Sequence, residues 1–471
     1  METLQRTANR GSISTGGYEI DNSLKLEADN SEAIAATNST QSGNRKTWTF
    51  STWVKRTEID MSGAFGVNAL FYAASSGIAF MNSDELRIVL YTDGGLTGSF
   101  TLSQLFRDTS AWYHIVLTVD STEATSTNRV KLWLNGEQVT DFSTETYPNL
   151  NDEFQFGKAQ SAAPIRIGNA YWGTSPLSAY IAETHYLNGT AKQASDFGEY
   201  DADSGIWIPK EYTDGGYGDI GFYYKYDNAS SLGEDSSGEG HDASSLQNIT
   251  AADQATDTPT NNFCIMSPLW NYANDCVISD GGSYIDGSAA AWNGAKATFG
   301  LTAGKWYWEI KQLGSGGTFM GLQTDGEDNI SSGNAQSQNT SVVFYTDGTL
   351  QYSGGSESTT SASNSITTNS IVGFALDLDS GTQTIKIYLD GSLITTFGSS
   401  GTCNLSTYNI EDTTVFPFVA IYENTVNMNF GGYTRSSISS AAADANGYGT
   451  FEYAPPSGYY AICTKNLAEY G

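Results

Sequence analysis

Paired carboxylates are the first groups in this chain to test for chemistry, because two of them facing one cleft can cleave a glycosidic bond. Glu199 and Asp201 form an E-x-D pair, and Asp203 follows them in an acidic stretch that contains glycine. A retaining glycosidase holds its two carboxyl groups about 5–5.5 Å apart. Acidic side chains in such a stretch are mostly solvated. We therefore interpret it as an exposed loop and predict no catalytic residue there.

The histidines complete the search for catalytic groups. His114 and His185 lie on predicted strands, where packing or a hydrogen bond is expected, and His241 lies in an acidic segment. The sequence contains no G-x-S-x-G motif, no Walker A motif and no Cys–His pair with the character of a nucleophile. We predict that the protein is not an enzyme.

Aromatic rings in loops could instead bind sugars, since a sugar face stacks on a ring with polar groups around it. Tyr171 and Trp172 lie in GNAYWGTSP, a stretch bounded by glycine and proline between two predicted strands. Trp292 lies in AAAWNGAK, farther along the chain. We predict these three residues as glycan-binding. Packing in the core, where large aromatic residues often lie, is the alternative.

The charge balance limits the partners. The chain has 22 Lys and Arg against 52 Asp and Glu, which gives 22 − 52 = −30. Nucleic acids and anionic membranes are bound through Lys and Arg, so neither is expected as a partner. METLQRTANRGSIS lacks the apolar core of a signal peptide, and no apolar run reaches the ~20 residues of a membrane span. The cysteines lack CxxC spacing and predict buried thiols made in a reducing cytoplasm.

The elements that would position these residues are β-strands. Apolar alternation and aromatic residues predict strands in both halves of the chain, among them 47–56, 111–120, 128–142, 305–311, 371–379 and 383–397. Asn135-Gly136 and Asp390-Gly391 each predict a type I′ hairpin, because both central residues of that turn need positive φ. No helix of ordinary length is expected in the first half, although 194–201 could hold one turn.

Similar stretches recur at nearly one offset. VKLWLNGEQV reappears as IKIYLDGSLI, so that Lys131 corresponds to Lys386, a shift of 386 − 131 = 255. YTDGGL and YTDGTL are shifted by 345 − 91 = 254, and Trp53 and Trp308 are again 255 apart. We interpret these pairs as one sandwich plan used twice. Duplication and convergence are both open as its origin.

Evenly spaced strands with hairpin turns predict an all-β chain of two jelly-roll β-sandwich domains in tandem, joined by a loop-rich linker. The expected segments are an N-terminal arm (1–17), a first sandwich (18–208), an acidic polar linker (209–262), a second sandwich (263–435) and a C-terminal tail (436–471). The linker has few large apolar residues and should bury little surface, apart from one strand at 221–227.

The strands also resemble known families. WTFSTWVKR, WYHIVLTVD, KLWLNGEQV and YIAETHYLNG, in that order, resemble the laminin-G-like, concanavalin-A-like lectin fold. GKWYWEIK, GFALDLDSGTQTIKIYLDG and FPFVAIYENTVNMNFG resemble a SPRY domain, which is also a bent β-sandwich. The combination resembles virion proteins of tailed phages, particularly of marine bacteria, over nearly the whole chain.

That resemblance implies a virion surface protein, on a tail fibre or a receptor-binding projection, that attaches to the host surface through a glycan. A capsid or tail decoration without receptor binding is the alternative, and a polysaccharide-degrading enzyme comes third. The implied partners are other virion proteins and a host-surface glycan or protein. A homo-oligomer is implied, with a trimer favoured. The arm 1–17 would attach the protein to the virion, which is assembled in the host cytoplasm.

The resemblance also makes Ca²⁺ the candidate ion, because related lectin-like sandwiches often hold it at a rim through oxygen ligands. The candidate ligands lie in the linker, in and before DSSGEGHDASS, and are Asp227, Asp235, Glu239 and Asp242. A solvated acidic loop is an equally open interpretation of them. For Asp377 and Asp379 we favour a strand end that turns through Ser380-Gly381.

Overall fold

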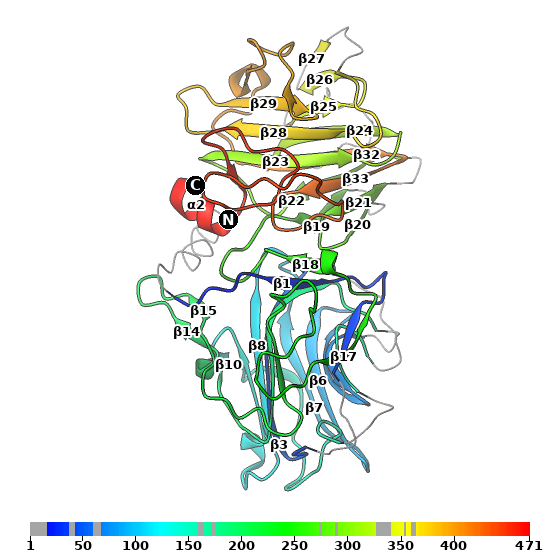
Figure 1. The fold of residues 1–471 in the computed structure, drawn as a ribbon, viewed down its shortest axis with the longest axis vertical. Helices are drawn as coiled ribbons and strands as arrows, with labels where there is room; N and C mark the ends of the chain where they lie inside the picture. Colours follow the sequence, from blue (N-terminus) through cyan, green and yellow to red (C-terminus); the bar gives the residue numbers. More distant parts are fainter. Residues whose placement is uncertain are drawn as a thin grey trace. The chain divides into compact units, whose positions relative to one another are not determined.

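The chain folds into two compact units, Arg10–Thr260 and Asn261–Gly471, and each is a sandwich of β-sheets (Figure 1). The predicted all-β fold is confirmed. The structure, a computed structural model, describes residues 17–36, 43–59, 67–158, 164–170, 175–272, 276–287, 291–325, 341–352, 355–358 and 364–471. Tyr171, Trp172 and nearly all of the predicted arm 1–17 lie outside these residues.

The first unit has two facing sheets. Sheet 1a has, in spatial order, β10 (Glu137–Gln138), β9 (Val130–Leu134), β8 (Tyr113–Asp120), β3 (Thr47–Arg56), β13 (Ala179–Asn188), β1 (Ser23–Leu26) and β18 (Gln254–Ala255), with β16 (Phe222–Tyr224) paired to β13. Sheet 1b has β11 (Phe142–Thr146), β7 (Gly95–Leu105), β6 (Glu85–Thr92), β5 (Ser76–Met81), β4 (Val67–Ala73), β12 (Ile165–Ile167), β2 (Ala33–Ala36) and β17 (Ala243–Gln247). A separate small sheet joins β14 (Gly198–Tyr200) and β15 (Trp207–Pro209).

The second unit repeats this arrangement. Sheet 2a has β30 (Ser392–Leu393), β29 (Thr384–Leu389), β28 (Ile371–Asp377), β23 (Lys305–Gln312), β33 (Asn424–Asn429), β21 (Tyr284–Gly287) and β20 (Val277–Ser279), with β31 (Cys403–Asn404) on β29 and β34 (Tyr460–Ala461) on β23. Sheet 2b has β27 (Gly355–Ser358), β26 (Thr349–Tyr352), β25 (Ser341–Tyr345), β24 (Gly317–Thr324), β32 (Val415–Tyr422), β22 (Asn293–Ala297) and β19 (Met266–Tyr272).

In the residues that the structure describes, the helical elements are short: the 3₁₀ turns η3 (Ser126–Asn128), η4 (Ala194–Asp196), η5 (Ala251–Asp253) and η8 (Leu405–Tyr408) and the helix α2 (Thr464–Tyr470). The turn expected within 194–201 is therefore present, as η4. In the described part of the chain, no helix has the length and apolar character needed to cross a membrane.

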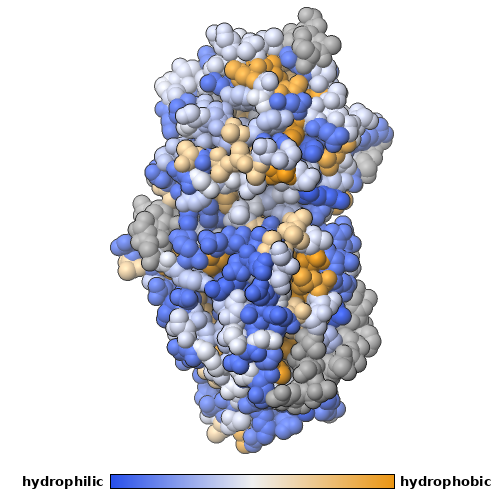
Figure 2. Space-filling model, viewed as in Figure 1, coloured by the Kyte–Doolittle hydropathy of each residue, from blue (hydrophilic) through white to orange (hydrophobic). Residues whose placement is uncertain are grey.

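Alternation along the strands fills one core between the sheets of each unit. On β8, Ile115, Leu117 and Val119 point into the core of the first unit and are fully buried. Full burial of one such side chain stabilises the fold by about 1.5–3 kcal/mol. On the face of Figure 2, hydrophobic residues form separate small patches among hydrophilic ones, in keeping with a chain in which Ser, Thr, Asn and Gly replace many charges.

Both predicted hairpins are confirmed. Asn135 and Gly136 have φ of 48° and 83°, and Asp390 and Gly391 have φ of 49° and 77°. Each glycine also makes room for a ring from a later segment. A Cβ on Gly136 would lie 2.3 Å from the Trp207 ring, and one on Gly391 would lie 2.5 Å from the ring of Tyr453.

The two sandwiches share one strand order, but not every sequence match reflects it. Strands that have equivalent neighbours in their sheets follow one another in the same chain order in the two units. This correspondence runs from β1 and β21 at the start to β13 and β33 at the end. The YTDG stretches break this pattern, because the one at Tyr91 joins β6 to β7 whereas the one at Tyr345 joins β25 to β26. Trp308 lies in the core against Phe374, whereas Trp53 faces away from its core and stacks on His114. Of the three pairs of similar stretches, only the hairpin pair occupies equivalent positions in the two folds.

The expected linker 209–262 is mostly part of the first sandwich, which corrects the prediction. Its strands β16, β17 and β18 pair with β13, β2 and β1. Buried lysines of sheet 1a bind its acidic residues: Lys55 Nζ lies 2.7 Å from Asp257, and Lys25 Nζ lies 2.8 Å from Asp253. Polar composition predicted little burial, but ion pairs and edge pairing hold this segment in place.

The expected tail 436–471 is likewise part of the second sandwich. Strand β34 pairs in parallel with β23, and α2 comes directly after it in the chain. The buried carboxylate of Glu309 on β23 accepts the backbone N–H groups of Glu452 and Tyr453 at 2.9 and 2.8 Å. The second unit therefore extends to Gly471.

Candidate functional site

The acidic residues predicted as Ca²⁺ ligands form a turn that uses its own carboxylates. Asp235 accepts the backbone N–H groups of Tyr223, Ser237 and His241 at 2.8–3.0 Å, and Asp242 accepts the N–H of Asp235 at 2.8 Å. Although burial alone would raise the pKa of Asp235, these hydrogen bonds hold it below its usual value. Asp227 and Glu239 are exposed.

The cation site expected at this turn stays a prediction. Among the residues that the structure describes, no set of three or more Asp, Glu, His or Cys side chains is arranged to hold a metal ion. Backbone donors occupy the carboxylate of Asp235. Asp377 ends β28 as expected: it accepts the N–H groups of Asp379 and Ser380 and pairs with Lys305 at 2.8 Å.

Trp292 belongs to an aromatic cluster on sheet 2b. Its ring centroid lies 4.6 Å from that of Phe319, 5.6 Å from that of Tyr422 and 6.2 Å from that of Tyr345. Trp292 is half-buried and Phe319 is fully buried. Most of the Trp292 ring is therefore used for packing on the sheet, which favours the alternative interpretation made from the sequence. Tyr171 and Trp172 lie outside the described residues.

The histidines on the strands of sheet 1a are buried under the segment that carries β14 and β15. Trp207 Nε1–H donates to Nδ1 of His114 at 2.9 Å, and His114 Nε2 lies 2.9 Å from Ser51 Oγ. Because indole is only a donor, His114 is neutral and its Nε2 carries the proton. Burial, with a smaller contribution from His185, lowers the pKa of His114 to about 3.

A buried carboxylate lies beside the second histidine. Glu183 has φ of 50° at a bulge in β13, and its carboxylate accepts the hydroxyls of Tyr18, at 3.0 Å, and Tyr223. His185 Nε2 lies 3.8 Å from it, and burial lowers the pKa of that imidazole. The phenol donors occupy Glu183, and no second carboxylate contacts it in the described part of the chain.

Glu199 and Asp201 do not form a catalytic pair. Glu199 is exposed on β14, and Asp201 caps a turn by accepting the N–H and Oγ–H of Ser204, both at 2.7 Å. Both side chains face water as expected, but Glu199 lies on a short strand paired with β15 and not in a loop.

The candidate binding site is a groove on the outer face of sheet 1b, across β4, β5 and β6. Tyr72 on β4 pairs with Gly77 on β5, which in turn pairs with Val89 on β6. A Cβ on Gly77 would lie 2.0 Å from the Tyr72 ring, so the ring lies flat over the glycine. Arg87 and Tyr91 point outward from β6 beside Val89 and complete a groove of about 280 Å³. We call this the Tyr72 groove.

Arg87 gives the Tyr72 groove its charge. Its side chain is half-buried and makes no ion pair with any residue that the structure describes, although the chain has a net charge of −30. Burial and Tyr91 raise the pKa of Tyr72, and Arg87 opposes that rise. Two phenol rings and one guanidinium therefore line the same space, which suits stacking on a sugar and binding of its hydroxyl or acidic groups.

Sequence reasoning missed the Tyr72 groove. Its other lining residues include Ala170 and Ser175, which lie within the GNAYWGTSP stretch, but the prediction named neither Tyr72 nor Tyr91. The available signal was outward alternation in ELRIVLYT, where Arg87, Val89 and Tyr91 share one face. Nothing in the sequence pairs that face with Tyr72.

Comparisons with known proteins agree with the fold. Residues 28–195 match the family model described as the concanavalin A-like lectin/glucanases superfamily. No curated protein matches the chain. Similar solved structures include the SPRY domain of human HERC1 (16% identity over 35% of this chain and 96% of that one, TM-score 0.28) and the TRIM65 PSpry domain (14% identity, 36% and 89%, TM-score 0.26).

Both TM-scores lie below 0.5, so the sandwich fold of the second unit rests on its own strand pairing. The family match lies within the first unit and includes every described strand of the Tyr72 groove. The first unit is therefore similar, over residues 28–195, to the concanavalin A-like lectin/glucanases superfamily.

Proposed function

We propose that this chain is a non-catalytic carbohydrate-binding protein of a tailed-phage particle, and that it attaches the particle to a host-surface glycan. The observation that carries the proposal is the Tyr72 groove, in which Tyr72 and Tyr91 flank a half-buried Arg87 on rigid strands of a lectin-like domain. The resemblance of both halves to phage virion proteins supports the location on the particle.

The state of the titratable groups supports binding without catalysis. His114 and His185 are buried with lowered pKa values, and tyrosine hydroxyls occupy Glu183. General acid–base catalysis needs a group that can reach the substrate and change its protonation near the working pH. Under this proposal these residues stabilise the sheet, and the sugar binds on the opposite sheet of the unit.

Binding of purified protein to host polysaccharide, measured by calorimetry, tests the proposal. Loss of a central tyrosine or arginine contact typically costs about 2 kcal/mol or more, ~30-fold in Kd. Tyr72→Ala and Arg87→Gln should each weaken binding by that amount. Arg87→Lys keeps the positive charge but loses the planar, forked set of N–H donors of the guanidinium, so it should weaken binding less. Trp292→Ala is the matched control in the other unit and should leave Kd unchanged.

The same preparation separates the other functions. Undiminished binding by Tyr72→Ala and Arg87→Gln would discard the Tyr72 groove as the site. Absence of binding by the wild type, together with no block of infection, would favour a decoration role. Release of reducing sugar from the polysaccharide would favour an enzyme.

A further inference from the structure

A second pocket of the first unit lies on the outer face of sheet 1a, between the β9–β10 hairpin, η4 and the small sheet of β14 and β15. Its volume is about 340 Å³. Its aromatic walls are Trp133, Tyr200 and Trp207, and both tryptophans pack in a cluster outside the core of the sandwich. We call it the Trp207 pocket. The Tyr72 groove lies on the other sheet of the unit, so the two are separate.

The contacts of Tyr200 and Trp207 show that both rings face this one space. The two residues are directly opposite each other in the β14–β15 pair, so their side chains share one face of that sheet, and their ring centroids lie 4.9 Å apart. The Tyr200 hydroxyl donates to Glu137 Oε1 on β10 at 2.6 Å, and the Trp207 ring lies against Gly136. The shared face of β14 and β15 therefore turns toward the β9–β10 hairpin.

Both rings are held in place and still reach water. Trp207 is fixed through its indole N–H, which donates to buried His114. Tyr200 is fixed at its hydroxyl by Glu137 and at its ring by Trp207. Nevertheless, Tyr200 is 48% exposed and Trp207 is half-buried. A ring that is already ordered loses little conformational entropy when a ligand stacks on it, so the pair forms a prepared apolar surface.

The rim of the Trp207 pocket supplies both donors and acceptors of hydrogen bonds. Gln193 and Ser195 line it and are exposed, and an amide and a hydroxyl each donate and accept. Lys210 Nζ donates to Ser195 O at 3.1 Å and makes no ion pair with a described residue. Glu199 also borders the pocket, but alternation along β14 turns its side chain to the face opposite Tyr200. We therefore assign Glu199 no contact.

We propose that the Trp207 pocket is a second carbohydrate site, which binds one neutral sugar unit with its apolar face on Tyr200 and Trp207 and its hydroxyls on the rim. The inference rests on the proposed function, a carbohydrate-binding chain, but not on the Tyr72 groove. A volume of 340 Å³ equals that of about 11 water molecules at ~30 Å³ each, which suits a single hexose unit. An aromatic surface ringed by polar groups is what a sugar needs. The carboxylate of Glu137 beside Tyr200 opposes an acidic sugar.

Fluorine NMR of the full chain, labelled with 5-fluorotryptophan, tests this site separately from the Tyr72 groove. The probes are the trisaccharides of glucose, galactose and mannose. At millimolar concentration, at least one of them should cause a saturable shift of the Trp133 and Trp207 signals, which are assigned from Trp→Phe variants. No described lining residue of the Tyr72 groove is a tryptophan, so the shift should persist in Tyr72→Ala. A pocket for one sugar unit should bind more weakly than that groove.

Substitutions in the Trp207 pocket identify the contacts. Tyr200→Ala should weaken binding at least about tenfold, whereas Tyr200→Phe keeps the ring and should weaken it less. Ser195→Trp fills the pocket and should abolish the shift, and the melting temperature will show that each variant folds. The matched control is Tyr453→Ala, which removes the ring packed at the equivalent glycine turn of the second unit and should leave Kd unchanged.

Several outcomes would overturn the proposal. They are no saturable shift of the Trp133 and Trp207 signals with any of the three trisaccharides, equal losses in Tyr200→Ala and Tyr453→Ala, and binding that survives in folded Ser195→Trp. Tighter binding of tri-galacturonate than of the galactose trisaccharide would overturn the assignment of a neutral sugar. A shift that persists while Tyr72→Ala leaves polysaccharide binding undiminished would remove the Tyr72 groove and support the Trp207 pocket.

Discussion

The hairpins β9–β10 and β29–β30 match in their hydrogen bonds, and yet the segments that come after them enter opposite sheets. Val139 N donates to Leu132 O at 2.8 Å, and Ile394 N donates to Ile387 O at 2.9 Å. In both turns the Asn135 or Asp390 side chain accepts a backbone N–H of the neighbouring strand, at 2.7 and 2.8 Å. Turn chemistry therefore determines the hairpin but not the course of the chain beyond it.

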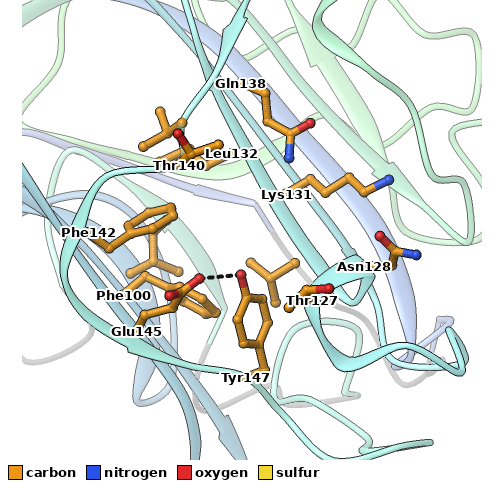
Figure 3. A pocket seen from close by; sticks show the side chains of 13 residues that line it. Phe100, Thr127, Asn128, Lys131, Leu132, Gln138, Thr140, Phe142, Glu145 and Tyr147 are labelled. Carbon is orange, nitrogen blue, oxygen red and sulfur yellow. Dashed lines mark hydrogen bonds between the residues drawn. The ribbon is translucent and has the colours of Figure 1, made fainter.

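The course of the chain after each hairpin depends on the next apolar residues. After β30 the chain supplies Leu405 and Tyr408, which complete the core. After β10 it supplies the alternating stretch FSTET of β11, whose single large apolar residue, Phe142, packs from the other sheet. One plan thus gives a filled edge in the second unit and an open edge in the first, where Phe100, Leu132 and Phe142 help to line a cavity of about 250 Å³ (Figure 3). Substitutions in the two units can test that difference.

Tyr408→Ala should have the largest effect. Removal of a fully buried aromatic ring costs about 3–5 kcal/mol, whereas Tyr147→Ala, at the half-open edge of the first unit, should cost about 1 kcal/mol. Hydrogen exchange at β29 and β9, followed by mass spectrometry, reports each unit separately. Similar losses in the two variants would mean that the two edges are packed alike.

His114→Gln should change the pH dependence of the first unit, and every histidine of the chain lies in that unit. The folded pKa of about 3 lies below the unfolded value, so unfolding binds a proton as the pH falls below ~6.5. Wild type should therefore lose about 1.4 kcal/mol per pH unit relative to the variant between pH 6 and 4. Urea unfolding at the two pH values measures this, and parallel losses in both proteins would contradict it.

Gly136→Ala and Gly391→Ala should be destabilising by similar amounts. Both positions have positive φ, and both would push a Cβ into a ring, so each should cost about 1–3 kcal/mol. Thermal unfolding of the two variants gives the comparison. A loss confined to one of them would show that the hairpins are alike only in backbone.

Chelation should have the smallest effect, namely none. Since backbone donors occupy Asp235, EDTA should leave the melting temperature of the chain unchanged. A fall that added Ca²⁺ reverses would restore the cation site predicted from the linker residues.

Local chemistry made part of the fold predictable from the sequence. The hairpins at Asn135 and Asp390 needed only the positive-φ rule, and the core face of β8 needed only alternation. Membership of 209–260 in the sandwich escaped prediction, because it depends on Lys25 and Lys55, more than 190 residues away, pairing with Asp253 and Asp257. The Tyr72 groove escaped for the same reason, since it forms between strands whose register no local signal encodes.

The position of β1 between β13 and β18 has a consequence for synthesis on the ribosome. Ser23 pairs with Ala255 and donates its hydroxyl to Asp257 O at 2.6 Å, so its last contacts wait for 257 − 23 = 234 further residues. At ~5–20 residues per second, that delay is about 10–50 s. During that time the nascent first unit exposes one edge of its earliest strand, which makes this edge a natural target for a chaperone.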